Sequence, residues 1–332
     1  MQFMIQEPKR VAFMGTPQFA VPSLSALLDH APRGRLWASG LDIVGVITRP
    51  DKPAGRGRTL GPSPVKQFAL AKGLPVYQPG SLKRKEALDL IHSLRPNIII
   101  VVAFGQILPP PVLEYPINGC LNVHASLLPR HRGASPIAAA ILAGDKQTGV
   151  TIMEMEEGLD TGPIIAQIST PIMADENAGQ LSDRLAELGA GLLVATLPLW
   201  LAGGIETIAQ DESKATMTRT LRKEDGWLDW TRDALDLDLH VRAYTPWPGA
   251  FTRWGDRILK IARAHPVSDN GGRQPGDCFT TGEGKNRSLA VACGSGALVL
   301  EVVQLQGKRA MPSADLLRGH PSLASARLGP TA

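Results

Sequence analysis

Short apolar runs alternate with amphipathic segments along the first half of the chain. Val11 to Met14 is apolar and ends at a tight turn that begins at Gly15, and Val21 to Leu28 then has apolar residues at helical spacing. Strand, turn and helix in this order open a βα unit. Ile43 to Thr48 and Asn97 to Val102 predict further strands. Because these runs are apolar on both faces, they indicate an α/β fold with a doubly wound, mostly parallel sheet covered by helices on both sides.

The alternation continues toward the middle of the chain. Cys120 to Val123 predicts a strand, and Gly149 to Met155 and Ile164 to Thr170 predict two more, one on each side of the turn Gly158-Leu159-Asp160-Thr161-Gly162. Asn177 to Leu201 predicts a long amphipathic helix rich in Leu and Ala. In doubly wound sheets ligands bind at the carboxyl ends of the strands, so functional residues are expected in the loops that follow them.

A change in composition divides the chain into two predicted domains. Residues 10–203 carry the α/β pattern, preceded by a short amino-terminal extension. From residue 204 the sequence is polar and charged, which predicts a linker over 204–222. Residues 223–320 contain short β-like runs, such as Ala297 to Val303, separated by Gly and Pro. They predict a small β-barrel domain.

Composition and charge narrow the class of protein. With 43% hydrophobic and 20% charged residues, the 332-residue chain is typical of a globular protein with a sizeable core. The net charge of +4 is a mild indication of a polyanionic partner. Three distant cysteines without metal-ligand spacing indicate thiols in a reducing compartment. Residues 1–10 do not resemble a secretory signal, and apolar runs such as Ile98 to Phe104 are too short to cross a bilayer. A cytoplasmic protein without membrane contact is therefore expected.

Asn122, His124 and Asp160 are the first candidates for chemistry. Asn122 and His124 lie two residues apart on a predicted strand and so share one face. An amide can donate to a developing oxyanion and an imidazole can exchange protons near neutral pH, which suits acyl transfer. Asp160 lies in a turn that two glycines shape, and a carboxylate beside an imidazole would orient it. Taken one at a time, these features are also explained by polar groups at a strand end and by an ordinary Asx turn.

Several nucleotide and hydrolase motifs are absent from the sequence. The turn after the first strand is not G-x-G-x-x-G, because Pro17 and Ala20 stand where the second and third glycines would be. A nicotinamide cofactor is therefore disfavoured. The chain also contains neither a Walker sequence nor a G-x-S-x-G elbow before a helix.

A basic loop follows the second predicted strand. Residues 49–64 are rich in Gly, Pro, Arg and Lys and have no period of their own, with Lys66 just beyond. Long irregular loops inside compact domains are usually functional or disordered. Arginines on such a loop can pair with phosphates or read base edges. The alternative is a solvent-exposed run of charges.

In combination these motifs resemble the folate-dependent formyltransferases. Asn122-Val123-His124-Ala125-Ser126-Leu127-Leu128-Pro129-Arg130 and the turn Gly158 to Gly162 carry the resemblance. Three further stretches are similar to the members of that family that act on methionyl-tRNA: Gly15 to Ala20, Arg49 to Lys66, and Arg242 to Pro248. The resemblance extends from about Arg10 to Gly319. The sequence departs from the family at the amino-terminal extension and at His131, and neither departure is expected to affect the catalytic chemistry.

The resemblance implies a formyltransferase domain over 10–203 and a tRNA-binding barrel of oligonucleotide-binding type over 223–320. It implies 10-formyltetrahydrofolate as co-substrate and initiator methionyl-tRNA as acceptor, with N-formylmethionyl-tRNA for translation initiation as product. No metal is expected, because the formyl group on N10 is already an activated acyl donor. The chain is expected to work as a monomer.

The resemblance also implies residue roles, carried over by position. The catalytic residues are Asn122, His124 and Asp160. The folate-binding residues are Ser126, Leu127, Leu128, Pro129, Val102, Phe104, Gly105 and Ile107. Arg56 matches the loop arginine associated with the acceptor end of tRNA, and the other tRNA-binding residues are Arg49, Lys52 and Arg58.

Two alternatives remain from the sequence. One is a formyltransferase that acts on a small amine, such as a nucleotide sugar or a purine precursor. The long basic loop and the basic second domain speak against it, because a small acceptor needs neither. The other is a nucleic-acid-binding protein whose α/β half is catalytically inactive, which the complete set of Asn122, His124 and Asp160 disfavours.

Overall fold

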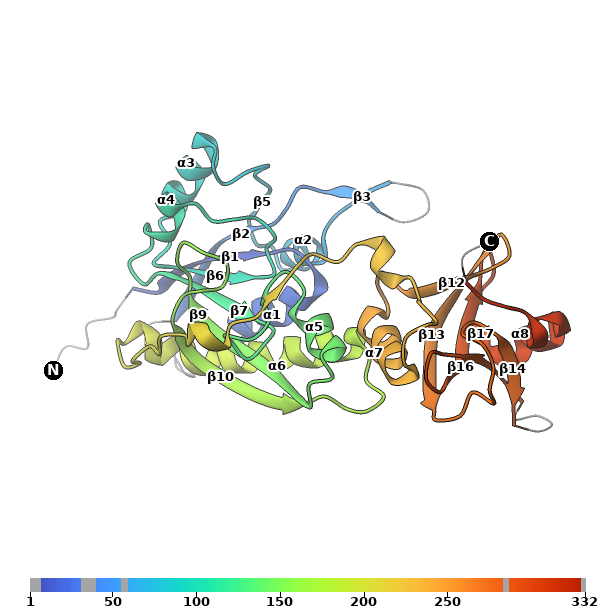
Figure 1. The fold of residues 1–332 in the computed structure, drawn as a ribbon. Helices are drawn as coiled ribbons and strands as arrows, with labels where there is room; N and C mark the ends of the chain where they lie inside the picture. The colour runs from blue at the N-terminus through green and yellow to red at the C-terminus, as the bar shows by residue number, and fades with distance from the viewer. Residues whose placement is uncertain (1–6, 31–39, 55–58, 283–286, 330–332) are drawn as a thin grey trace. The chain divides into compact units, whose positions relative to one another are not determined.

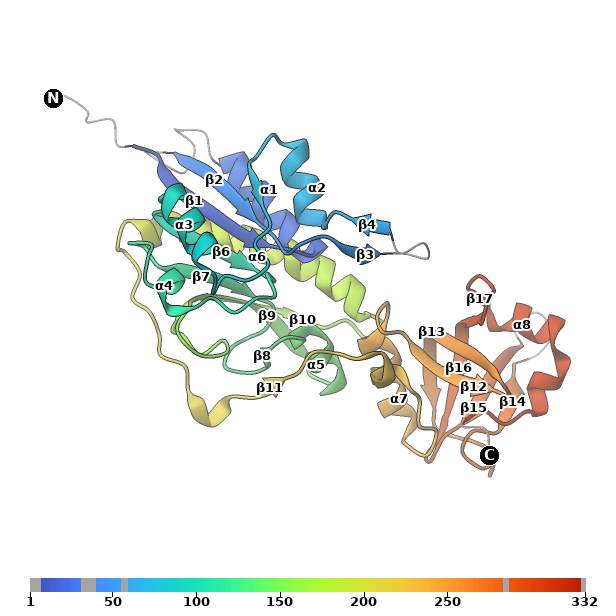
Figure 2. The ribbon, with the colours of Figure 1, turned by 90° about the horizontal axis from the view of Figure 1, so that it is seen from above.

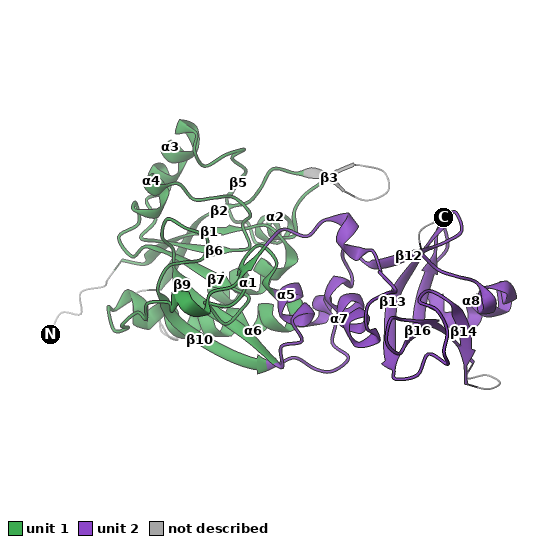
Figure 3. Ribbon diagram, in the orientation of Figure 1, with its two compact units in different colours: residues 1–136, 147–170, 182–218 green, residues 137–146, 171–181, 219–332 purple. Residues whose placement is uncertain are grey.

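A computed structural model describes residues 7–30, 40–54, 59–282 and 287–329. The chain divides into two compact units (Figure 3). Unit 1 consists of residues 1–136, 147–170 and 182–218, and unit 2 consists of residues 137–146, 171–181 and 219–332.

A seven-stranded sheet forms the centre of unit 1 (Figures 1 and 2). The strands lie in the order β10 (Ile164–Pro171), β9 (Gln147–Glu154), β7 (Cys120–His124), β6 (Ile98–Val102), β1 (Lys9–Gly15), β2 (Leu41–Ile47) and β5 (Val76–Tyr77). Pairing is parallel from β7 through β6, β1 and β2 to β5, whereas β7 and β9 are antiparallel. The prediction of a doubly wound, mostly parallel sheet is confirmed.

Helices cover both faces of this sheet. They are α1 (Val21–His30), α2 (Pro64–Ala71), α3 (Lys85–Leu94), α4 (Pro110–Leu113) and α6 (Ala178–Leu201), with a 3-10 turn, η1 (Gln18–Ala20), before α1. On one face, α3 and α4 contribute to a core that includes Ala12, Ile99 and Cys120 from three strands. On the other, α6 approaches β7 and β9 so closely at Gly189 that an added Cβ would lie 2.9 Å from Val123. All five residues of β6 are consequently buried, as their apolar sequence predicted.

Helix α6 is longer and more apolar than its neighbours. Its 24 residues include an 18-residue window with a mean hydropathy of 1.3, so by length and composition alone it could cross a membrane. The expectation that no apolar stretch is long enough to span a bilayer therefore overlooked this helix. Leu185, Leu193 and Leu197 are fully buried and recur at helical spacing. This stripe belongs to the core of unit 1, where a central helix of an α/β domain needs an apolar face.

Unit 2 contains a helix and an antiparallel sheet. Helix α7 (Ala234–Tyr244) begins at Asp233, whose carboxylate accepts a hydrogen bond from the Leu235 backbone N–H. The strands run in the order β12 (Ala250–Trp254), β13 (Arg257–Val267), β16 (Ala297–Leu305), β15 (Ser288–Ala292) and β14 (Cys278–Thr281), and β17 (Met311–Pro312) also pairs with β16. Leu237 and Val241 of α7 pack with Ile261 and Leu300 in its core. The small β domain is confirmed, and its pairing describes a sheet that runs from β12 at one edge to β14 at the other. The remaining elements of this unit are α5 (Pro136–Leu142), which belongs to it from residue 137 on, η3 (Lys223–Gly226), α8 (Ser313–Gly319) and η5 (Pro321–Ser325).

The segment expected to be a linker, 204–222, lies along unit 1 for most of its length. Ile208 exchanges backbone hydrogen bonds with Ile164. Beyond the short turn η2 (Glu212–Lys214), β11 (Met217–Thr218) pairs in parallel with β8 (Arg132–Gly133). The boundary between the compact units follows Thr218.

Candidate active site

Strand β7 carries Asn122 and His124 to one face of the sheet. Alternate residues of a strand point to the same side, and Asn122 pairs with Val101 of β6 on the face that α3 and α4 cover. The residues are 8% and 6% exposed. Buried polar groups need hydrogen-bond partners, so what surrounds these two decides what they can do.

Asp160 reaches them from the turn between β9 and β10. Its φ of 56° lies in the left-handed region that non-glycine residues rarely adopt. At Gly162 an added Cβ would lie 1.9 Å from the Glu154 carbonyl oxygen, so only glycine allows the turn to close this tightly. The two constraints together direct the Asp160 carboxylate toward β7.

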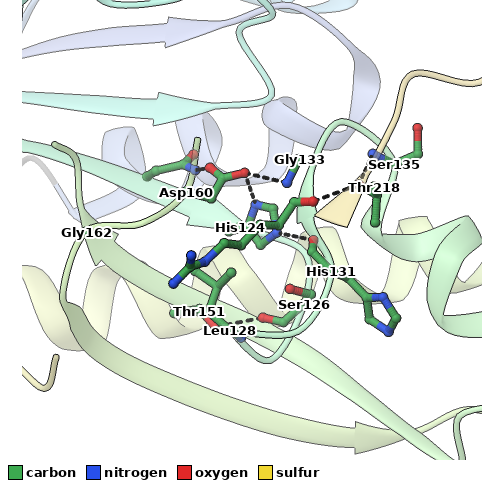
Figure 4. A network of polar contacts seen from close by, with 12 residues as sticks. His124, Ser126, Leu128, His131, Gly133, Ser135, Thr151, Asp160, Gly162 and Thr218 are labelled. Atoms are coloured by element: carbon green, nitrogen blue, oxygen red, sulfur yellow. Dashed lines mark hydrogen bonds and ion pairs between the residues drawn. The ribbon is translucent and has the colours of Figure 1, made fainter. Parts of the chain in front are cut away.

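The three side chains meet, as Figure 4 shows for His124 and Asp160. The Asn122 amide donates to Asp160 Oδ1 at 3.2 Å, and His124 Nδ1 lies 3.6 Å from Asp160 Oδ2. The Gly133 backbone N–H donates to the same Oδ2 at 2.8 Å. Both carboxylate oxygens therefore accept hydrogen bonds from neighbouring donors.

The backbone carbonyl of His131 fixes the tautomer of His124. Because a carbonyl oxygen can only accept, the 3.0 Å contact requires a proton on His124 Nε2. Nδ1 is then the nitrogen that exchanges protons, and it faces Asp160. Asp160 lies beside the other ring nitrogen, where the sequence predicted a carboxylate that orients the imidazole. Residue 131 contributes through its main chain, so the departure in its side chain does not alter this contact.

The loop after β7 is braced from within unit 1. The Thr151 hydroxyl donates to the Ser126 carbonyl at 2.7 Å and accepts from the Leu128 N–H at 3.2 Å (Figure 4). Gln167 donates to the Leu128 carbonyl at 2.8 Å. Sequence reasoning missed Thr151, although it pairs directly with His124 across β7 and β9. The only available signal was a hydroxyl residue within an apolar strand.

The predicted folate-binding residues differ in how exposed they are. The Ser126 side chain is fully buried and donates to the Arg130 carbonyl at 2.6 Å. Three others are buried side chains: Val102, Phe104 and Leu128. The rest are partly or fully exposed: Leu127, Pro129, Gly105 and Ile107, the last at 77%. A ligand could therefore contact the exposed residues directly, and the buried residues only through their main chain. The folate assignment stays a prediction.

The basic loop is described only in part. Arg56 and Arg58 lie outside the described residues. Lys52 lies in β3 (Lys52–Ala54), which forms a hairpin with β4 (Thr59–Gly61). The Arg49 guanidinium lies 3.2 Å from the point where a Cβ on Gly105 would be, beside the loop that follows β6. The predicted tRNA contacts of these residues remain predictions.

An ion pair anchors the base of this hairpin. Lys66 donates to Asp51 and to Gln78, each at 2.6 Å, and Gln78 donates to Asp51 at 2.8 Å. The hydrogen bond from Lys66 is the main cause that lowers the pKa of Asp51 below its usual value. The charge of Lys66 is thus neutralised locally by Asp51.

Among the described residues, His, Cys, Asp and Glu side chains form no group of three that could hold a metal ion. The polar side chains that meet at this site are an amide, an imidazole and a carboxylate. Such a set can stabilise an oxyanion and move protons.

Comparison with known proteins gives matches over nearly the whole chain. Residues 9–197 match the formyl transferase family, and residues 220–321 match the formyl transferase C-terminal domain. The chain is 46% identical to the methionyl-tRNA formyltransferase of Marinobacter nauticus, over 93% of this chain and 96% of that protein. It is 47% identical to the methionyl-tRNA formyltransferase of Magnetococcus marinus, over 96% and 98% of the two chains.

Among solved structures, an N-formyltransferase from Helicobacter canadensis, in complex with folinic acid and dTDP-3-aminofucose, has a similar fold. The TM-score is 0.62 at 16% identity, over 88% of this chain and 98% of that one.

Proposed function

The chain belongs to the formyl transferase family, and on that premise we propose that it transfers the formyl group of 10-formyltetrahydrofolate to the amino group of initiator methionyl-tRNA. Its relatives of that name are 46% and 47% identical over nearly their full lengths. The observation that carries the proposal is the convergence of Asn122 and His124 with Asp160, which lies 38 residues beyond Asn122. The product, N-formylmethionyl-tRNA, serves translation initiation.

The reaction needs one new bond, one broken bond and one proton transfer. The neutral methionyl amino group attacks the formyl carbon, and the carbonyl electron pair moves onto oxygen. The tetrahedral centre then collapses, the bond between carbon and N10 breaks, and N10 receives a proton while the new amide nitrogen loses one. The protein must therefore stabilise an oxyanion and carry a proton between two nitrogens.

The site offers groups for both tasks. An amide nitrogen carries two hydrogens, so Asn122 can donate one to Asp160 and the other to the oxyanion. His124 is held through Nε2 and can donate from a protonated Nδ1. Asp160 accepts the proton that the amine loses and returns it toward N10. Removing one oxyanion donor typically costs about hundredfold to thousandfold in rate.

The loops after β6 and β7 would hold the folate. Ile107, Leu127 and Pro129 offer accessible apolar surface at the carboxyl ends of these parallel strands, where ligands of such sheets bind. The internal bracing of residues 126–128 by Thr151 keeps the loop in place without using the folate.

The tRNA would be bound by basic residues of the loop 49–64 and of unit 2. Arg56 and the other basic residues of that loop are one source. The exposed basic side chains of unit 2 include Arg253, Arg257, Lys260, Lys308 and Arg309. The Arg257 guanidinium lies over the Trp254 ring at 4.4 Å, a cation–π contact that holds this cation at the surface. Two further arginines of this unit, Arg242 and Arg263, already pair with Asp238 and Glu301. The protein is proposed to act as a cytoplasmic monomer.

One assay tests this function. Labelled formyl from 10-formyltetrahydrofolate is offered to methionyl-tRNA and, separately, to small amines such as an amino-sugar nucleotide. We expect transfer to the tRNA alone, lost in His124→Ala. Preferred transfer to a small amine would refute the proposed acceptor. A melting temperature that reduced folate does not raise would contradict the donor site, because any ligand of the native state stabilises it.

A further inference from the structure

We propose that Gln210 is a positioning residue that holds the Asp160 turn in its reactive conformation. Gln210 lies in the segment expected to be a linker, outside every motif that the sequence singled out. The inference rests on the proposed function, because it assigns Gln210 to the same reaction.

The Gln210 amide holds the turn at two points. Its Nε2 donates to the Asp160 carbonyl oxygen at 2.9 Å and to the Gly162 carbonyl oxygen at 2.7 Å. The two carbonyls flank Thr161 and belong to the residues whose backbone makes the turn tight. A single side chain thus ties down the main chain on both sides of the turn.

The orientation of this amide is fixed from behind. Gln210 Oε1 accepts from Arg132 Nε at 3.0 Å and from Arg132 Nη2 at 2.8 Å. The oxygen faces two donors and the nitrogen faces two acceptors. A flipped amide would therefore place its N–H groups against the Arg132 guanidinium and its oxygen against the two carbonyl oxygens. Arg132 is itself buried, and Glu212 accepts from its two terminal nitrogens at 2.9 and 2.6 Å. The amide therefore presents its N–H groups to the turn and not to solvent.

The same assembly also reaches the Asp160 side chain. Arg132 and Gly133 form β8, which pairs with β11, and the Gly133 N–H donates to Asp160 Oδ2 at 2.8 Å. Gln210 thus holds the main chain of Asp160, while the residue after Arg132 holds its carboxylate. Asp160 needs both restraints because its φ of 56° is disfavoured for a residue with a side chain. Without Gln210 we expect the turn to relax and the carboxylate to leave His124.

The test is a double-mutant cycle between Gln210 and Asp160. In Gln210→Glu one oxygen still accepts from Arg132, but the other replaces the amide nitrogen and faces two carbonyl oxygens. We expect kcat to fall about 10- to 100-fold, since a misplaced catalytic group costs about this much, while KM for both substrates changes little. In an Asp160→Asn background the same substitution should cost almost nothing more, because the group that it positions is already inactive.

The control is Asp211→Asn, at a neighbouring exposed residue whose hydrogen bonds stay within residues 211–214. It should keep the wild-type kcat. An equal loss from Gln210→Glu in both backgrounds, or no loss in the wild-type background, would overturn the proposal. If a melt shows that Gln210→Glu is unfolded, Gln210→Met takes its place in the same cycle. Failure of the proposed function is a separate result, because the wild-type enzyme would then not formylate methionyl-tRNA.

Discussion

Replacing Asn122 by aspartate tests whether this side chain must donate hydrogen bonds. The two side chains have nearly the same shape, but the substitution turns a donor into a second acceptor. The amide nitrogen lies 3.2 Å from Asp160 Oδ1, so the variant would bring two carboxylate oxygens to that separation. At an effective dielectric constant of about 20, two unit charges at this distance repel by roughly 5 kcal/mol. The site is mostly buried, so water can relieve little of this repulsion.

Two costs therefore add in Asn122→Asp. Loss of an oxyanion donor costs about hundredfold to thousandfold in kcat, and Asn122→Ala should lose only this amount. Asn122→Asp should lose more, because the repulsion also displaces Asp160 from His124. Two carboxyl groups at this distance relieve the repulsion by sharing one proton. The ratio of Asn122→Asp activity to Asn122→Ala activity should therefore rise as the pH is lowered.

The assay is single-turnover formyl transfer to methionyl-tRNA from pH 5 to pH 8, at saturating folate, for the wild type and both variants. Folding is checked by circular dichroism at each pH. Our reasoning would be refuted if Asn122→Asp were as active as the wild type, or if it were more active than Asn122→Ala at pH 8.

Four further predictions follow from the structure. Gly162→Ala should lower the activity, and it should lower the free energy of unfolding by about 1–3 kcal/mol, because its Cβ would lie 1.9 Å from the Glu154 carbonyl oxygen. The matched control is Gly191→Ala, whose added Cβ would have no atom within 4 Å. Equal melting temperatures for the two variants would contradict this account. Burial raises the pKa of Cys120 and of Cys278 to about 12, so in the native enzyme at pH 8 a thiol reagent should label neither, and rapid native labelling would contradict their burial. Burial lowers the pKa of His240 to about 4, so between about pH 6.5 and pH 4 the unfolded chain binds more protons than the folded chain. The free energy of unfolding should therefore fall by up to about 3 kcal/mol as the pH falls through this window. Denaturant melts of His240→Gln should lack this part of the pH dependence. Arg56→Ala should raise KM for the tRNA and leave folate binding unchanged, and equal damage to both would indicate a structural role for the loop.

The parts of the site that the sequence predicts are those that depend on local pattern. Asn122 and His124 share a face because the side chains of a strand repeat every two residues. Asp160 lies in a turn that the glycines on both sides of it predict. The helix predicted from Asn177 to Leu201 is found at Ala178–Leu201, because its apolar residues recur at helical spacing. These features need only neighbours in the sequence.

The supporting residues could not be predicted in this way. Gln210 contacts a turn 50 residues earlier in the chain, and Arg132 contacts Glu212 across 80 residues. Hydrophobic periodicity carries no information on such pairs, and a polar, charged stretch after a helix has the composition of a linker. The carbonyl of His131 leaves no signal in the sequence, because every residue type supplies a carbonyl.

The central claim is that Asn122, His124 and Asp160 act as one unit on one carbonyl carbon. The most direct test is the rate of formyl transfer to methionyl-tRNA in Asn122→Ala, His124→Ala and Asp160→Asn, each alone and all three together. Groups that act as a unit give losses that are far from additive, so the triple variant should be only slightly slower than the slowest single variant. If the three losses multiplied in the combined variant, the residues would be acting independently and the account would be wrong.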